Sequence, residues 1–247
     1  MLYLNLFILF LVAYLIGAIP TGLILTKLFL KQDVRKIGSG STGATNVLRT
    51  GSKLLALATL VFDALKPYLA MVAVHGVSIL LFGKFVTFVG YGLYEEYITM
   101  AVCGITIFAH CYPVYLKFKG GKGVATAFGT LFLFSEKYYG LPVLPIIALS
   151  TWLTVAFISK KSSLSALTTA LLIPFYVYKF NNLGNGEAST NLVYFYIGAV
   201  VFVIFRHHAN IARLIKGTES NIKLSKDTSV SNKKETNKVN KKIKTKK

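Results

Sequence analysis

The sequence has little charge for its length. Of its 247 residues, 15% are charged and 54% are hydrophobic, whereas a soluble domain carries about 25% charged residues. Most side chains are therefore expected to face lipid or other helices rather than water. Acidic residues are the scarcest, because 9 Asp and Glu stand against 28 Lys and Arg.

Cysteine is also scarce, and its spacing argues against disulfides and metals. Cys103 and Cys111 are the two cysteines. Eight residues along one helix place them about 12 Å apart, which is beyond disulfide reach. No histidine or cysteine partners stand at metal-ligand spacing. We therefore expect free thiols, no metal site and no cofactor.

Long apolar runs dominate what remains. A bilayer core of about 30 Å needs roughly 20 apolar residues per helix. The first run is too long for the core of a signal peptide and follows no basic segment, so it is expected to be a retained span. The sequence predicts an all-α, polytopic helical membrane protein with about seven transmembrane helices, and five or six spans are the alternative. The candidate spans are 3–28, 54–82, 97–116, 123–135, 140–159, 164–180 and 191–206.

The loops between these spans alternate in charge. Cytoplasmic loops collect Lys and Arg, and the basic segments are 27–53, 117–122, 160–161 and the C-terminal tail. They share one side of the membrane only if an even number of spans separates them. Seven spans satisfy this condition with the N-terminus outside and the C-terminus in the cytoplasm.

The C-terminal end differs in composition from the rest. We expect residues 1–216 to form the membrane domain and residues 217–247 to form a basic, disordered cytoplasmic tail, because the tail has too few apolar residues to fold. Such a tail is suited to anionic lipid headgroups, at about 1 kcal/mol for each lysine near the surface. Nucleic acid is not an expected partner, because no aromatic residues interleave these charges.

A segment rich in glycine and hydroxyl groups, residues 37–51, follows the first span. Its glycines let backbone N–H groups approach an anion closely, and it leads into a helix N-terminus, which favours anions. Arg49 is suited to grip a phosphate with two parallel hydrogen bonds. A Walker-type nucleotide loop is excluded because Gly43 is followed by Ala44 instead of Lys. The alternative is a flexible loop between helices.

Two further segments share this character. The first contains Lys119, Gly120, Gly121, Lys122 and Gly123 just before a span. Positive-inside anchoring would explain its lysines, but not three glycines in four positions. The second, 206–213, places His207 and Asn210 three residues apart on one helix face. A histidine there suits proton transfer or a hydrogen bond to phosphate, and the alternative is a basic cap at the membrane surface.

Other polar residues within the spans have mainly structural interpretations. Asp63 and Lys66 stand three apart in the second span, and ionisable residues there usually pair inside the bundle. A structural ion pair is favoured over a catalytic one, and His110 is interpreted as a packed or capping histidine. Ser163 is either a helix N-cap or a substrate ligand.

In combination, these segments resemble the bacterial acyl-phosphate-dependent glycerol-3-phosphate acyltransferases over about residues 14 to 222. The first motif runs from Gly38 through Arg49, the second from Lys117 through Thr126, and the third from His207 through Glu219. The sequence departs from the family pattern at a few positions, among them Ser41, Pro67, Ala109, the His208-Ala209 pair and Asn221.

The resemblance implies transfer of a fatty acyl group from acyl phosphate to the 1-hydroxyl of glycerol 3-phosphate, at the cytoplasmic face of a bacterial cell membrane. It implies Ser39, Arg49, His207 and Asn210 as catalytic residues. The implied substrate-binding residues are Gly40, Gly43, Thr45, Asn46, Lys119, Gly120, Gly121, Lys122, Gly123 and Ser163. A transporter for a phosphorylated metabolite and a lipid-binding scaffold are the rival interpretations.

Overall fold

The computed structural model describes residues 2–82, 93–183 and 190–222. All regular secondary structure in these ranges is helical, which confirms the expected all-α class. The main helices are α1 (Leu2–Gly17), α2 (Thr21–Leu30), α3 (Ala44–Val47), α4 (Lys53–Phe82), α5 (Leu93–Cys111), α6 (Val124–Tyr139), α7 (Val143–Ser159), α8 (Ser162–Leu183), α9 (Thr190–Arg206) and α10 (His208–Ile215).

Each expected span coincides with a helix or a helix pair. Among the described residues, four segments are long and apolar enough to cross a membrane, namely Tyr3–Leu30, Lys53–Leu81, Glu96–Leu116 and Ser162–Asn182. The bent pair of α9 and α10 would be a fifth, and α7 is a shorter apolar helix. The number of about seven spans, and the orientation of the termini, therefore stay predictions. The first span is broken between α1 and α2 at Pro20, which has no N–H to continue the helix.

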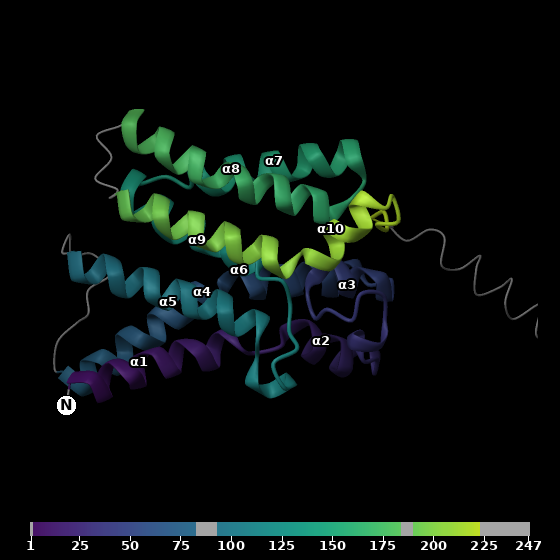
Figure 1. Ribbon diagram of the computed structural model, residues 1–247. Helices are drawn as coiled ribbons and strands as arrows, with labels where there is room; N and C mark the ends of the chain where they lie inside the picture. The colour runs from purple at the N-terminus through teal and green to yellow at the C-terminus, as the bar shows by residue number, and fades with distance from the viewer. Residues whose placement is uncertain (1, 83–92, 184–189, 223–247) are drawn as a thin grey trace, which may run out of the picture.

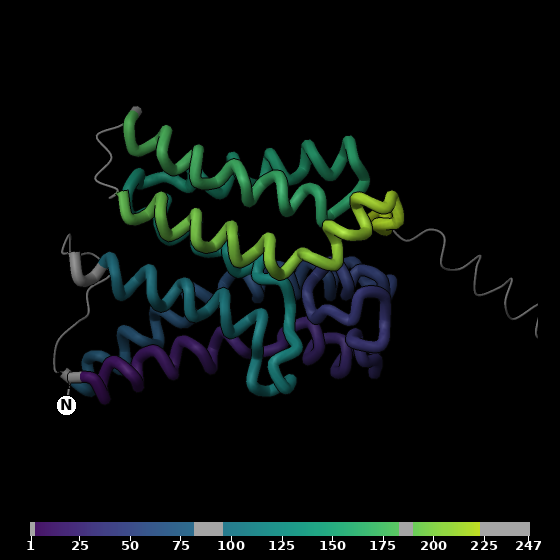
Figure 2. Tube along the Cα trace, in the orientation of Figure 1, coloured from purple at the N-terminus to yellow at the C-terminus, as the bar shows by residue number. Residues whose placement is uncertain are grey.

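The long helices lie side by side, and the short ones gather at one end (Figure 1). α2, α3 and α10 lie at this end, whereas the N-terminus lies at the opposite end. α9 ends at Arg206, and the chain turns by 64° into α10, as Figure 2 shows along the trace. The three motif segments are thereby brought to the same end of the bundle.

Small residues allow the helices that carry the site to pack closely. A Cβ added at Gly129 of α6 would lie 1.9 Å from the carbonyl oxygen of Ala64 in α4. Helices within membranes associate through such small residues, because the bilayer supplies no hydrophobic driving force between them. Buried apolar clusters around Phe134 and around Met71 form much of the core of the bundle. The contact fixes the N-terminus of α6 next to α4.

Candidate active site

The glycine-rich segment before α3 is organised by one buried amide. The Nδ2 group of Asn46 donates to the carbonyl oxygens of Val34, Ile37 and Ser41 at 2.8–3.0 Å, and its Oδ1 accepts from the Ser39 N–H at 3.1 Å. Its side chain therefore holds the loop in shape. The side-chain amide of Asn46 is thus hydrogen-bonded within the loop, and the substrate contact expected for Asn46 stays a prediction.

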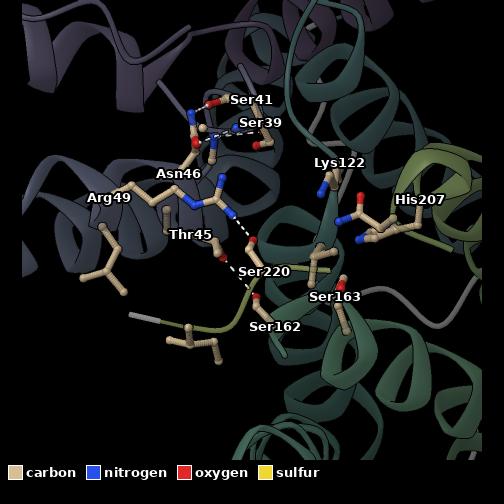
Figure 3. A pocket seen from close by; sticks show the side chains of 18 of the residues that line it. Ser39, Ser41, Thr45, Asn46, Arg49, Lys122, Ser162, Ser163, His207 and Ser220 are labelled. Carbon is tan, nitrogen blue, oxygen red and sulfur yellow. Dashed lines mark hydrogen bonds between the residues drawn. The ribbon is translucent and has the colours of Figure 1, made fainter. Parts of the chain in front are cut away.

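Glycine is needed at position 38 to place Arg49. Gly38 has φ +54°, and a Cβ there would lie 2.3 Å from Nη1 of Arg49. The Nη2 atom of Arg49 donates to the Ser220 hydroxyl at 2.6 Å. Thr45 pairs with Ser162 across the loop at 3.1 Å between their hydroxyl oxygens. Figure 3 shows both contacts, which join the loop to the start of α8 and to the segment after α10.

His207 lies at the bend between α9 and α10. Its Nδ1 is 2.8 Å from the carbonyl oxygen of Val203, which only accepts, so Nδ1 carries the proton. Burial lowers the pKa of His207 to about 4, so the ring is neutral near pH 7 and Nε2 is an acceptor. Figure 3 shows His207 and Lys122 on one side of the cavity and Arg49 on the other.

Glu219 joins three of the site's side chains. Its carboxylate accepts from Ser163 at 2.7 Å, from Asn210 at 2.6 Å and from Nε of Arg213 at 2.6 Å. Burial alone would raise its pKa, but these hydrogen bonds hold the pKa of Glu219 below its usual range. Glu219 ends the third sequence motif but was not among the predicted site residues. Its place in that motif, nine positions after Asn210, was the available signal.

The segment around Glu219 closes one side of the site. Residues 218–222 line the cavity, although the predicted tail was expected to begin at residue 217. The Ile222 N–H donates to the carbonyl oxygen of Lys160 at 2.7 Å, and Lys161 Nζ donates to that of Glu219 at 2.7 Å. The remainder of the predicted tail, 223–247, lies outside the described residues.

The second glycine-rich segment contributes mainly Lys122. Lys122 and Gly123 line the cavity at the start of α6. Burial lowers the pKa of Lys122 to about 8. Gly120 and Gly121 do not line the cavity and pack against His110 instead, and Lys119 is exposed outside it.

The polar residues of the spans form one buried cluster beneath this loop. Lys66 Nζ lies 2.7 Å from Asp63 Oδ1 and 3.2 Å from His110 Nδ1. The Thr21 hydroxyl donates to the same Asp63 oxygen. The expected ion pair is therefore present, and Asp63 and His110 both border the cavity. His110 was interpreted as a packed or capping histidine, and it is buried and also borders the cavity.

These elements enclose a cavity of about 780 Å³, within the usual size of small-molecule sites. Leu60, Val124, Ala125, Trp152 and Ala166 form its apolar wall. Gly40, Lys119, Gly120 and Gly121 are the expected site residues that do not line it. Those that do are Ser39, Gly43, Thr45, Asn46, Arg49, Lys122, Gly123, Ser163, His207 and Asn210.

The sequence is similar to those of known glycerol-3-phosphate acyltransferases. A family model described as glycerol-3-phosphate acyltransferase matches residues 7–217. A glycerol-3-phosphate acyltransferase from Bordetella pertussis is 42% identical over 212 residues, covering 85% of this chain and 88% of that protein. The glycerol-3-phosphate acyltransferase from Dinoroseobacter shibae is 41% identical, and the match covers 86% of this chain and 90% of that protein. The one from Pelagibacter ubique is 39% identical, and the match covers 86% of this chain and 95% of that protein.

Solved structures agree with the sequence matches. The fold is similar to that of PlsY, an integral membrane glycerol 3-phosphate acyltransferase, in its glycerol 3-phosphate form, with a TM-score of 0.70 and 28% identity. The match covers 88% of this chain and 96% of that one. The lysophosphatidic acid form matches with a TM-score of 0.69 and 27% identity. The chain is therefore a multi-pass membrane protein that belongs to the glycerol-3-phosphate acyltransferase family.

Proposed function

We propose that the cavity is the site where a fatty acyl group passes from acyl phosphate to the 1-hydroxyl of glycerol 3-phosphate. The products are 1-acylglycerol 3-phosphate and inorganic phosphate. The observation that carries this proposal is one cavity with cationic side chains on two opposite sides and an apolar wall. Both substrates bear a phosphate, and only the donor needs room for a long chain.

The donor phosphate is assigned to the side of Arg49. Arg49 suits two parallel hydrogen bonds to phosphate, and Ser39, Gly43 and Thr45 line the cavity beside it. The Ser220 hydroxyl accepts a hydrogen bond from the guanidinium of Arg49, and a phosphate would compete with this hydroxyl for the same donor. The acyl chain is assigned to the wall that includes Leu60 and Trp152.

The acceptor phosphate is assigned to Lys122 and Gly123 at the N-terminus of α6. Backbone N–H groups at a helix N-terminus favour anions, and Lys122 adds a charge beside them. Ser163 and Asn210 lie next to this position, held by Glu219. The acceptor would then present its 1-hydroxyl between Lys122 and the donor carbonyl.

The chemistry is direct attack of this hydroxyl on the acyl carbon. A new ester C–O bond forms, and the C–O bond to phosphate breaks with its electron pair leaving on phosphate. Nε2 of His207 accepts the hydrogen bond of the hydroxyl and orients it. The proton passes to Nε2 or directly to the departing phosphate. Acyl phosphate is already activated, so no acyl-enzyme is needed.

We further propose that the cavity faces the cytoplasm, with the N-terminus outside. The basic segments at 27–53, 117–122 and 160–161 lie at the cavity end of the bundle (Figure 1). This asymmetry follows the positive-inside rule. Cysteine labelling of intact cells and of inverted vesicles, at a cysteine placed in 117–122, tests the orientation, and labelling of intact cells would contradict it.

A direct assay tests the reaction. Purified protein in detergent is incubated with acyl phosphate and labelled glycerol 3-phosphate, and labelled lysophosphatidate is measured. Arg49→Ala and His207→Ala are expected to abolish turnover while the protein still inserts. His207→Gln keeps a hydrogen-bond acceptor but not a base, so a loss of about 10²- to 10⁴-fold would assign the proton to the ring. Absence of product with wild-type protein, with acyl-CoA and acyl-carrier protein also tested as donors, would refute the proposed function.

A further inference from the structure

A cluster of buried charge lies between the membrane core and the cavity. Asp63, Lys66 and His110 are 1%, 3% and 6% exposed and come from α4 and α5. Removing such groups from water is costly, and replacing a buried ion pair with apolar residues is often stabilising. Packing therefore gives little reason for this cluster. Its position directly beneath the Gly120–Gly123 segment suggests another role.

The cluster determines which edge of His110 faces the loop. The ammonium of Lys66 only donates, so His110 Nδ1, 3.2 Å away, accepts from it. The opposite edge of the ring reaches Gly121. A Cβ added at Gly121 would lie 2.0 Å from Nε2, 2.8 Å from Cδ2 and 2.9 Å from Cε1. All three of these atoms belong to the imidazole, so the ring sets how deeply the loop backbone sits.

The loop is also held by its backbone. The Gly121 N–H donates to the His110 carbonyl at 3.0 Å, and the Gly120 N–H donates to that of Cys111 at 3.1 Å. Arg206 from the end of α9 donates to the Gly121 carbonyl oxygen at 2.9 Å. The next residue, Lys122, lines the cavity. A shift of Gly121 therefore moves the ammonium that the proposed function assigns to the acceptor phosphate.

We propose that His110 is a positioning residue for glycerol 3-phosphate: its ring, held by Lys66 and Asp63, sets the height of Gly121 and thereby places Lys122 in the cavity. The inference rests on the proposed role of Lys122. It gives the buried cluster a function in substrate affinity, and it explains why glycine stands at position 121 although that residue does not line the cavity.

The contact between residues 110 and 121 is testable as a pair. Gly121→Ala is expected to raise KM for glycerol 3-phosphate at least tenfold, because its methyl group meets the ring. His110→Ala is expected to raise KM by a similar factor, because the ring no longer supports the loop. In the double variant the methyl group occupies the vacated space. The fold-increase in its KM should therefore be well below the product of the fold-increases in the two single variants. In all three variants kcat should change less than KM.

Gly120→Ala supplies the matched control. A Cβ there would lie 2.3 Å from the His110 carbonyl oxygen and 2.4 Å from Pro113 Cδ, neither of which is removed by His110→Ala. His110→Ala should therefore not rescue Gly120→Ala. Lys117→Asn, at an exposed position outside the cavity on the same connection, should keep the wild-type KM, since Asn tolerates its positive φ.

Two outcomes would overturn the inference. One is a wild-type KM in His110→Ala. The other is a double variant whose fold-increase in KM equals the product of those of Gly121→Ala and His110→Ala. If His110→Ala does not fold, His110→Asn replaces it, because its amide oxygen still offers Lys66 an acceptor while the ring is removed.

Lys122→Met separates this inference from the proposed function. An unchanged KM in that variant would refute the role of Lys122, whereas a raised KM together with an inert His110 would refute only the positioning role.

Discussion

The lowered pKa of Lys122 gives a sharp prediction for the pH dependence of activity. Burial lowers this pKa from the ordinary lysine value to about 8, with Glu219 opposing the shift and Arg213, Arg49 and Arg206 adding to it. A lysine with a lowered pKa is charged below that pKa and neutral above it. Affinity for an anionic acceptor should therefore be present at neutral pH and should fall as pH rises through about 8.

The magnitude follows from the titration. One pH unit on either side of a pKa corresponds to a ratio of about ten between the two protonation states. The charged fraction of Lys122 falls from about nine-tenths at pH 7 to about one-tenth at pH 9. The kcat/KM for glycerol 3-phosphate should therefore fall about tenfold over this interval, because kcat/KM reports groups of the free enzyme.

The assay measures initial rates of lysophosphatidate formation from pH 6 to 9.5, at saturating acyl phosphate whose concentration is checked at each pH. Lys122→Arg is the matched variant, since a guanidinium stays charged over the whole range. It should lose the alkaline decline even if its absolute rate is lower. His207, with a pKa of about 4, does not titrate within this range.

An alkaline decline with the same midpoint in Lys122→Arg would refute the reasoning. So would a wild-type profile that stays flat to pH 9.5. Either result would mean that the ammonium of Lys122 does not contact the acceptor phosphate in the productive complex, and the assignment of the two sides of the cavity would have to be reversed.

Three further predictions follow from other contacts. Gly38→Ala should displace the side chain of Arg49, because the added Cβ would collide with it. The expected loss in kcat/KM is about 10²- to 10³-fold, the usual cost of losing an oriented donor, and normal activity in correctly inserted protein would contradict this. Glu219→Gln removes a negative charge that raises the pKa of Lys122, so the alkaline midpoint should move to lower pH, and an upward shift would be inconsistent with the structure. Trp152 is the sole tryptophan and lies in the apolar wall of the cavity, so lysophosphatidate with a brominated acyl chain should quench its fluorescence. Unbrominated lysophosphatidate is the control, and equal emission with both lipids would show that the acyl chain does not contact Trp152.

The helical bundle and its motif residues were accessible from sequence. Apolar runs of membrane length predict helices wherever they occur, because backbone polar groups in lipid must be satisfied internally. Charge asymmetry between loops placed the glycine-rich segments on one face, and the chemistry of glycine, arginine and histidine indicated phosphate. Arg49, Lys122, His207 and Asn210 were all expected in the site and all line the cavity.

The division of roles among the motif residues was not accessible from sequence. Asn46 and Gly121 match phosphate-loop patterns, yet the side chain of Asn46 holds its own loop and Gly121 rests on the His110 ring. A residue pattern is the same whether a glycine clears space for a ligand or for a neighbouring side chain. Contacts between elements far apart in the chain decide between the two.

The sequence by itself determined a helical membrane protein with phosphate-binding chemistry on one face, because hydrophobicity and charge act locally along the chain. Only the tertiary structure decided that residues 218–222, Glu219 among them, close the site, and that Asp63, Lys66 and His110 support it from below. One set of contacts joins α8 to the segment after α10, and the other joins α4 to α5. Their geometry depends on how closely the helices pack, and no local pattern encodes that distance.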